Sequence, residues 1–207
     1  MKRLDPKIKN QLEELRPKLI QFLKEHVTKN RVQHIIRVSR TAKKYAKRIG
    51  LDYNKAELSG LLHDIAKEYK NPRLLAIAKL KKIPLDFIDI DNPHILHARV
   101  GALIARDKFG IKDRDVLAGI RCHTLGEPYM SPLAMIVYLA DSTEPGRDKK
   151  KSGKIRKTFK QKGLESAVLE ALNLKLLMVI KKNGKVHPLT ITARNWLIGE
   201  IKKKKKS

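Results

Sequence analysis

Apolar residues recur at intervals of three and four along almost the whole chain, and no segment shows a sustained alternation of apolar and polar positions. The two clearest stripes consist of Leu12, Leu15, Leu19, Phe22 and Leu23, and then of Val32, Ile35, Val38, Ala42, Tyr45, Ala46 and Ile49. Such spacing places the apolar side chains of a segment on one helix face, and Gly50 is a typical helix end. The pattern predicts an all-α fold.

Residues that favour helix ends divide the rest of the chain. Asn54 with Glu57 is typical of a capping box and predicts a helix through Lys67. Asn71-Pro72 predicts the start of the next helix, and Pro84 lies beyond its end. Further helices are expected over residues 96–109, from 113 onward, from 131 to about 141, over 163–182 and over 192–201. Residues 145–162 look like a loop, and 186–190 look extended.

Length and composition narrow the class of protein. The chain has 207 residues, which fits one domain with appendages, and no linker divides two cores. We expect a basic helical extension at 1–20, a single helical-bundle domain at 21–199 and a lysine tail at 200–207. One cysteine, Cys122, excludes an internal disulfide framework. The start of the chain lacks the apolar core of a signal peptide, and the apolar stretch between Glu127 and Asp141 is too short to span a bilayer. A cytoplasmic protein without a membrane segment is therefore expected.

The formal net charge is +26, and the five lysines of Lys202–Lys206 account for only part of it. Nine basic residues and one acid, Asp148, lie between Arg147 and Lys162. Such a surface attracts polyanions and favours weak contact with nucleic acid. A solvated lysine-rich surface is the simpler interpretation, because no aromatic-interleaved patch or nucleic-acid-binding motif accompanies the charge.

Polar residues interrupt apolar helix faces at three places. His34 lies at the edge of its apolar stripe, His63-Asp64 lies within Leu-Leu-His-Asp-Ile-Ala, and Asp141 follows Ile-Val-Tyr-Leu-Ala. A carboxylate on a buried face costs several kcal/mol unless it is paired or binds a metal. Two imidazoles and two carboxylates share one obvious solution, which is to bind a single cation.

The types of these side chains indicate which cation. Imidazole and carboxylate together suit iron, manganese, zinc or nickel better than magnesium or calcium. A thiolate-rich zinc site is excluded because the chain has a single cysteine. Four protein ligands around an octahedral ion leave two positions for water and substrate. Such a cation polarises phosphoryl oxygens and lowers the pKa of a bound water, as hydrolysis requires.

The order and spacing of these residues resemble the HD superfamily of metal-dependent phosphohydrolases, and one branch is closer still. Four strings are similar to the YqeK family: GLLHDIAK at 60–67, LHA at 96–98, IRCHTLG at 120–126 and ADSTEPGR at 140–147. An HD dipeptide alone is weak evidence for the superfamily, whereas the four strings together and in this order are specific to the YqeK family. The resemblance extends from about Phe22 to Leu197, so it assigns residues 21–199 to an HD phosphohydrolase domain.

The resemblance implies an iron-dependent symmetrical bis(5′-nucleosyl)-tetraphosphatase, which splits diadenosine tetraphosphate into two ADP. It implies that the metal ligands are His34, His63, Asp64 and Asp141. The same resemblance places these substrate-binding residues near the phosphates: His34, Arg37, Lys67, His97, His123, Thr124 and Arg147. Asp64, Lys67 and His97 are the expected catalytic residues. Manganese or another divalent transition metal would serve in place of iron, and a homodimer is expected from the family alone.

Several alternatives stay open at the level of sequence. His97 and His123 either donate hydrogen bonds to phosphate or ligate a second metal ion. The substrate could be another nucleotide, which would make the protein a nucleotidase or phosphodiesterase. A third hypothesis is a non-catalytic basic protein that binds RNA or the ribosome. Cys122 beside His123 raises the idea of a nucleophile, but its position in the interior helix pattern speaks against one.

Overall fold

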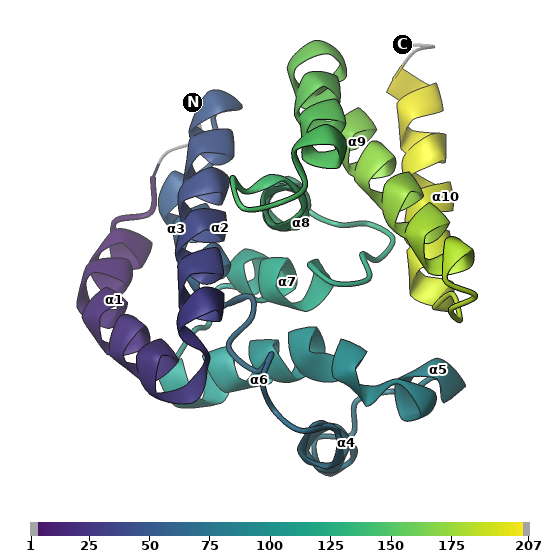
Figure 1. Ribbon diagram of the computed structural model, residues 1–207. Helices are drawn as coiled ribbons and strands as arrows, with labels where there is room; N and C mark the ends of the chain where they lie inside the picture. Colours follow the sequence, from purple (N-terminus) through teal and green to yellow (C-terminus); the bar gives the residue numbers. More distant parts are fainter. Residues whose placement is uncertain (1–3, 205–207) are drawn as a thin grey trace.

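The computed structural model describes residues 4–204, and every regular element in that range is a helix (Figure 1). The helices are α1 (Pro6–His26), α2 (Lys29–Arg48), α3 (Tyr53–Leu62), α4 (Asn71–Leu80), α5 (Phe87–Asp91), the 3₁₀ helix η1 (Pro93–Leu96), α6 (His97–Phe109), α7 (Arg114–Cys122), α8 (Pro132–Thr143), α9 (Lys149–Lys181) and α10 (Pro188–Lys204). The predicted all-α fold is confirmed. Lys205, Lys206 and Ser207 of the predicted lysine tail lie outside the described residues.

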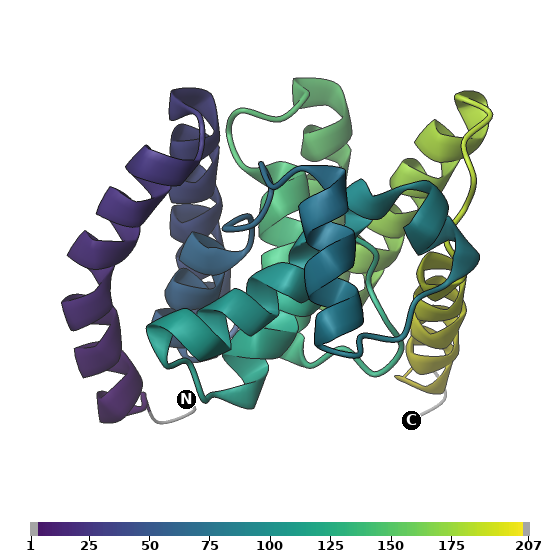
Figure 2. The ribbon, with the colours of Figure 1, turned by 90° about the horizontal axis from the view of Figure 1, so that it is seen from below.

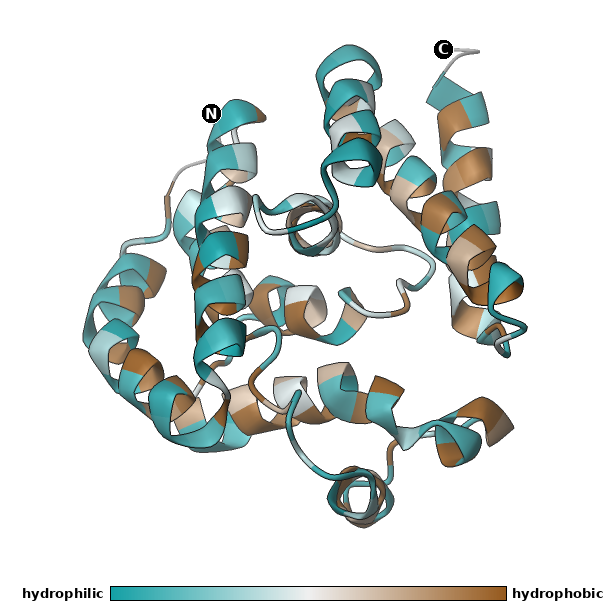
Figure 3. Cartoon of the chain, in the orientation of Figure 1, coloured by the Kyte–Doolittle hydropathy of each residue, from teal (hydrophilic) through white to brown (hydrophobic). Residues whose placement is uncertain are grey.

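The centre of the bundle is α8, whose residues 133–140 are all buried. It packs against α2, α7 and α9, while α3 packs closely along α2 (Figure 2). A helix that is apolar on all sides must lie inside the domain, because no face of it is suited to water. The outer helices, such as α1, instead carry both hydrophilic and hydrophobic residues (Figure 3). This arrangement lets a polar residue on α8, α2 or α3 face the interior at one common point.

Aspartate and serine side chains begin several of the helices. Asp52, Asp113, Ser131 and Asp148 each accept a hydrogen bond from a backbone N–H of the first turn. The cap of α3 is therefore Asp52, and the predicted capping box on Asn54 is wrong. The helix begins two residues earlier than predicted, and the Asp52 carboxylate accepts hydrogen bonds from the backbone N–H groups of Asn54 and Lys55. The same helix ends at Leu62 rather than Lys67, and a turn carries His63-Asp64.

Two of the predicted non-helical segments are wrong. Residues 149–162 form the first half of α9, because Asp148 caps it and a narrow stripe of Ser152, Ile155 and Phe159 is buried. The break comes at Gly163, whose φ of 85° is a conformation that only glycine adopts readily. Residues 188–190 are the first turn of α10 instead of an extended piece, with Pro188 in its first position. The short helices α5 and η1 were not predicted at all.

α1 runs through the predicted boundary between residues 20 and 21, and it buries Leu12 and Leu19 against the rest of the core. The division into extension, domain and tail therefore stays a prediction. In the described part of the chain, no helix is both long and apolar enough to cross a membrane.

Candidate metal centre

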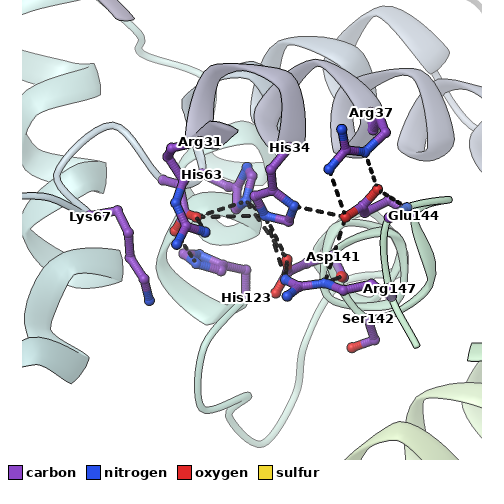
Figure 4. Close-up of polar contacts among 12 residues, drawn as sticks. Arg31, His34, Arg37, His63, Lys67, His123, Asp141, Ser142, Glu144 and Arg147 are labelled. Carbon is purple, nitrogen blue, oxygen red and sulfur yellow. Dashed lines mark hydrogen bonds and ion pairs between the residues drawn. The ribbon is translucent and has the colours of Figure 1, made fainter. Parts of the chain in front are cut away.

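Three helices bring the predicted ligands to one point. His34 comes from the middle of α2, His63 from the turn directly after α3, and Asp141 from the last turns of α8 (Figure 4). Asp64 follows His63 in the same turn. His34, His63 and Asp64 are buried, and Asp141 is partly exposed. Because α2 packs on both α3 and α8, the four side chains converge although they are far apart in sequence.

The two histidines lie within 3.9 Å of each other and of both carboxylates. His34 Nε2 lies 3.1 Å from Asp141 Oδ1 and 3.3 Å from His63 Nε2. Asp64 Oδ2 lies 3.5 Å from His63 Nε2 and 3.7 Å from His34 Nε2. His34, His63 and Asp141 thus offer ligand atoms around one common point, which is the geometry that a single cation requires.

A second group shares Asp64 with the first. Asp64 Oδ1 lies 3.3 Å from His97 Nε2, at the start of α6, and 3.3 Å from His123 Nε2, directly after α7. The two Nε2 atoms are 3.2 Å apart. The Thr124 hydroxyl lies 3.0 Å from Nε2 of His97 and 3.1 Å from Nε2 of His123. The two oxygens of Asp64 therefore face two separate pairs of histidines.

The protonation of these histidines follows from their other ring nitrogen. Nδ1 of His63, His97 and His123 lies 2.6–2.7 Å from the backbone carbonyl of Gly60, His94 and Ile120, respectively. A carbonyl only accepts hydrogen bonds, so each Nδ1 carries the proton and each Nε2 presents a lone pair. His34 is held in the same way, since its Nδ1 donates to Glu144 Oε1 at 3.0 Å.

Four imidazole lone pairs and two carboxylates therefore point at one another. Within this cluster no proton lies between the Nε2 atoms and the Asp64 oxygens, and Asp64 Oδ1 is a buried atom without a hydrogen-bond donor among the described residues. Buried acceptors in such proximity repel each other unless a cation lies between them. The residues present thus fit a divalent transition-metal ion, and Asp64 fits a ligand shared by two ions.

The pKa values place three of the candidate ligands in the protonation states that bind a metal ion. Burial lowers the pKa of His63 to about 3 and that of His97 to about 4, so both rings are neutral at pH 7. Burial alone would raise the pKa of Asp141, but the charge of the Arg147 guanidinium, which pairs with this carboxylate, helps to hold it well below the usual value. Neutral imidazole and ionised carboxylate are the forms that bind a metal.

Cationic side chains surround the cluster on its open side. Arg31 Nη1 lies 2.9 Å from Asp64 Oδ2, Lys67 Nζ lies 3.3 Å from His97 Nε2, and the Arg147 guanidinium pairs with the Asp141 carboxylate. Arg147 also donates to the Asp141 backbone carbonyl at 2.7 Å. Sequence reasoning missed Arg31, because nothing in its neighbourhood distinguishes it from the other lysines and arginines.

Arg37 and Glu144 lie behind His34 rather than at the ligand atoms. Arg37 Nε donates to Glu144 Oε2 at 2.5 Å, and the Gly146 backbone N–H donates to the same carboxylate at 2.6 Å. Arg37 was predicted to contact substrate, whereas its contact within the protein is this glutamate. Glu144 itself was missed, although it is buried and orients His34.

Replacing Glu144 should weaken the metal centre without removing a ligand. In Glu144→Gln, the His34 ring loses a charged acceptor at Nδ1, so its orientation and basicity decrease. Changes of this kind typically lower metal affinity by roughly 10–100-fold. Titration of the metal-free protein with Mn²⁺ measures the effect. The control is Glu170→Gln, which breaks an ion pair with Lys154 within α9. Unchanged affinity in Glu144→Gln would mean that Glu144 does not orient His34.

Cys122 should be chemically inert. Burial raises the pKa of its thiol strongly, so the native protein holds almost no thiolate at pH 8. We expect alkylation by iodoacetamide to be about a hundredfold slower in the native protein than in urea. The native rate should stay low between pH 7 and pH 9, while the rate in urea rises with pH. Rapid alkylation of the native protein that abolishes its activity would reinstate Cys122 as a candidate nucleophile.

Comparison with known proteins gives a consistent result. The HD domain model matches residues 31–146, which include His34, both residues of the HD dipeptide and Asp141. The chain belongs to the HD-domain family. It is also 37% identical to the symmetrical bis(5′-nucleosyl)-tetraphosphatase of Halalkalibacterium halodurans, over 90% of this chain and 99% of that relative. The corresponding Bacillus subtilis protein is 33% identical over 88% of this chain and 97% of its own length.

A solved structure from Clostridium acetobutylicum, described as a "predicted HD superfamily hydrolase involved in NAD metabolism", is 36% identical. Its TM-score is 0.85, and the match covers 89% of this chain and 97% of the other. Within the HD family, the chain therefore belongs to the YqeK-type branch of symmetrical tetraphosphatases. The resemblance stated from the four sequence strings is confirmed.

Proposed function

We propose that this chain is a metal-dependent hydrolase that cleaves diadenosine tetraphosphate symmetrically into two ADP. The observation that carries the proposal is the cluster of His and Asp acceptor atoms described above, with Arg31, Lys67 and Arg147 around its open side. A divalent cation would relieve the repulsion among the acceptors, and the cationic side chains beside it suit a substrate that is a polyanion. A dinucleoside tetraphosphate supplies such a charge. The relatives from Halalkalibacterium halodurans and Bacillus subtilis carry the name of this activity.

His34, His63, Asp64 and Asp141 would hold the first ion, and Asp64 with His97 and His123 would hold a second. The neutral Nε2 atom of His97 accepts hydrogen bonds and cannot donate one to phosphate, which favours the role of ligand for His97 and His123. Iron fits this mixture of imidazole and carboxylate, as does manganese. A bound ion would polarise the phosphoryl oxygens and promote formation of the attacking hydroxide from water.

The chain's own residues would position and neutralise the phosphates. The oxygen of water forms a bond to an inner phosphorus while the bridging P–O bond on its far side breaks, which yields two ADP. Arg147 and Arg31 can orient phosphate oxygens with their guanidinium groups. Lys67 would face the charge that builds on the transferred phosphoryl group. ADP is a weakly basic leaving group, so the site needs charge neutralisation more than a strong general acid.

Product analysis tests the proposal. The purified protein, loaded with iron or manganese, should convert diadenosine tetraphosphate to ADP as its sole nucleotide product. Equal amounts of AMP and ATP would contradict symmetric cleavage. Activity only on mononucleotides, cyclic dinucleotides or RNA ends would instead make the protein a phosphodiesterase or nucleotidase. Salt-sensitive RNA binding without any hydrolysis would favour a non-catalytic role.

The proposal also covers the location, the oligomeric state and the partners of the enzyme. We expect a cytoplasmic homodimer, on the basis of its family and its single buried cysteine. Weak contact with nucleic acid is expected through the lysines of 149–162, most of which are exposed along the first half of α9.

A further inference from the structure

Two segments without any acidic residue lie next to the metal centre. No aspartate or glutamate occurs between Glu25 and Asp52, a stretch that contains the whole of α2. None occurs between Asp148 and Glu165, a stretch that contains the first half of α9. On α1, by contrast, lysines and glutamates form two ion pairs with one another. A surface with charges of a single sign attracts polyanions more strongly than a mixed surface does.

Side chains join the two acid-free segments in space. The Tyr45 ring of α2 and the Phe159 ring of α9 have their centres 4.8 Å apart, and the Arg48 guanidinium lies over the same Phe159 ring. Arg156 of α9 donates to the backbone carbonyl of Thr143, at the end of α8, at 2.9 Å. Figure 1 shows the upper half of α2 and the first half of α9 on the same side of the molecule, with α8 seen end-on between them. The two segments therefore contribute to one face.

The exposed cations of this face form one row on each helix, at a spacing that places the members of a row on the same side of the helix. The two rows, together called the basic face, consist of Arg40, Lys44 and Arg48 on α2 and of Lys149, Arg156 and Lys160 on α9. No carboxylate pairs with any of these six side chains among residues 4–204. Eight residues of helix span about 12 Å, so each row is long enough to contact successive phosphates of a strand.

These charges oppose the stability of both helices. Arg40, Lys44 and Arg48 follow one another at intervals of four, and like charges at that interval repel each other. The first turn of α9 contains three lysines and no acid, although the helix dipole favours acids at that end. Cations that work against two neighbouring helices and have no acidic partner indicate an anion supplied from outside the protein.

The basic face begins at the metal centre. Arg147, on the open side of the His and Asp cluster, precedes Lys149 by two residues. On α2, the same side of the helix continues to Arg37, which lies behind His34 and contacts the same glutamate. A polyanion that follows the basic face therefore ends beside the proposed ions, where the tetraphosphate would be cleaved.

We propose that the basic face binds the phosphate backbone of RNA, and that the enzyme also cleaves a dinucleoside tetraphosphate that forms the 5′ end of an RNA strand. The inference rests on the proposed function and adds a substrate class to it. The oxygen of water bonds to an inner phosphorus while the bridging P–O bond on its far side breaks. The products are ADP and an RNA with a 5′-diphosphate. Because phosphate contacts carry no sequence information, RNA of any sequence is expected to bind.

Hydrolysis kinetics of the manganese-loaded full chain test this inference with two substrates. One is diadenosine tetraphosphate, and the other is the same dinucleotide extended at one 3′ end by about eight ribonucleotides, a usual length for a single-strand site. The unaltered protein should have the lower KM for the extended substrate. This advantage should decrease as the salt concentration rises, because counterions compete for the RNA backbone.

Charge reversal in each row identifies the surface that binds. Lys44→Glu and Lys160→Glu should each raise the KM for the extended substrate on the order of tenfold. The KM for diadenosine tetraphosphate should stay within about twofold, as is usual for an exposed charge. The matched control is Lys79→Glu, which makes the same change in charge at an exposed position of α4, on the opposite side of the molecule in Figure 1. It should leave both KM values unchanged.

The outcomes separate this inference from the proposed function. Equal increases of KM for both substrates in Lys44→Glu and Lys160→Glu, or no increase for either, would overturn the inference. Cleavage of diadenosine tetraphosphate without cleavage of the extended form would also overturn it and leave the proposed function intact. If the protein cleaves neither substrate, the proposed function and the cleavage of RNA ends both fail. Fluorescence anisotropy of labelled RNA then decides whether the basic face binds RNA, since unchanged binding by the two variants would overturn that part as well.

Discussion

Asp64→Ala is expected to lose both the metal and the activity. One oxygen of Asp64 faces His34 and His63, and the other faces His97 and His123, so this carboxylate belongs to both groups of ligand candidates. Its removal takes a negative charge from the middle of each proposed ion site. Since the loss of an outer contact alone typically costs 10–100-fold in affinity, the loss of a shared ligand should cost roughly a thousandfold or more in turnover.

Metal analysis and turnover of diadenosine tetraphosphate, measured on the same preparation, check this expectation. Asp107→Ala is a suitable control, because Asp107 is an exposed aspartate that pairs with Lys81 and Arg106 far from the ligands. It should keep the metal and the activity. Retention of a full complement of metal by Asp64→Ala would show that the carboxylate is not a ligand.

The second large effect is expected from Lys67→Ala, which should keep the metal but lose activity. Lys67 follows the HD dipeptide by one turn, and its ammonium group lies beside the Nε2 atom of His97. Burial lowers the pKa of Lys67, with a further contribution from Arg31 and Arg147. Loss of a contact that forms mainly in the transition state typically costs about 2–4 kcal/mol, or roughly a hundredfold to a thousandfold in kcat.

The comparison variant for this experiment is Lys70→Ala, three residues further along the chain at an exposed position. It removes the same charge from the same segment and should leave kcat within about twofold, as is usual for an exposed charge. Metal stoichiometry and kcat of both variants are the quantities to measure. The assigned role of Lys67 is wrong if Lys67→Ala loses the ion, or if it keeps both the ion and full activity.

The metal-ligand candidates could be predicted from the sequence because each is a polar residue on an apolar helix face. His34, His63, Asp64 and Asp141 break patterns that are otherwise hydrophobic, and a buried carboxylate needs a physical reason. The structure brings all four together. Their roles as ligands are a prediction that the metal analysis above will test.

The residues that support the ligands could not be predicted in the same way. Glu144 reaches His34 across 110 residues of sequence, and that proximity depends on how α2 packs on α8. Arg31 belongs to a set of 47 lysines and arginines, from which composition cannot select one. Its importance follows from the group that it faces, the ionised carboxylate of Asp64.

The errors in the helix assignment have a common physical origin. The first half of α9 is so rich in lysine that its apolar stripe is reduced to Ser152, Ile155 and Phe159, too narrow for a periodicity argument to detect. The turn after Leu62 continues an apolar run, so the sequence predicts a longer helix than the structure contains. In the proposed metal centre that turn lets His63 and Asp64 point into the same space from successive positions.

The central claim is that the His and Asp cluster acts only when it holds a divalent metal. The most direct test is hydrolysis of diadenosine tetraphosphate by one protein preparation before chelation, after removal of its metal, and after reloading with iron or manganese under anaerobic conditions. The structure predicts that ADP formation disappears with the metal, while the helical circular dichroism remains, and returns on reloading. Undiminished ADP formation by protein shown to be free of metal would contradict the claim.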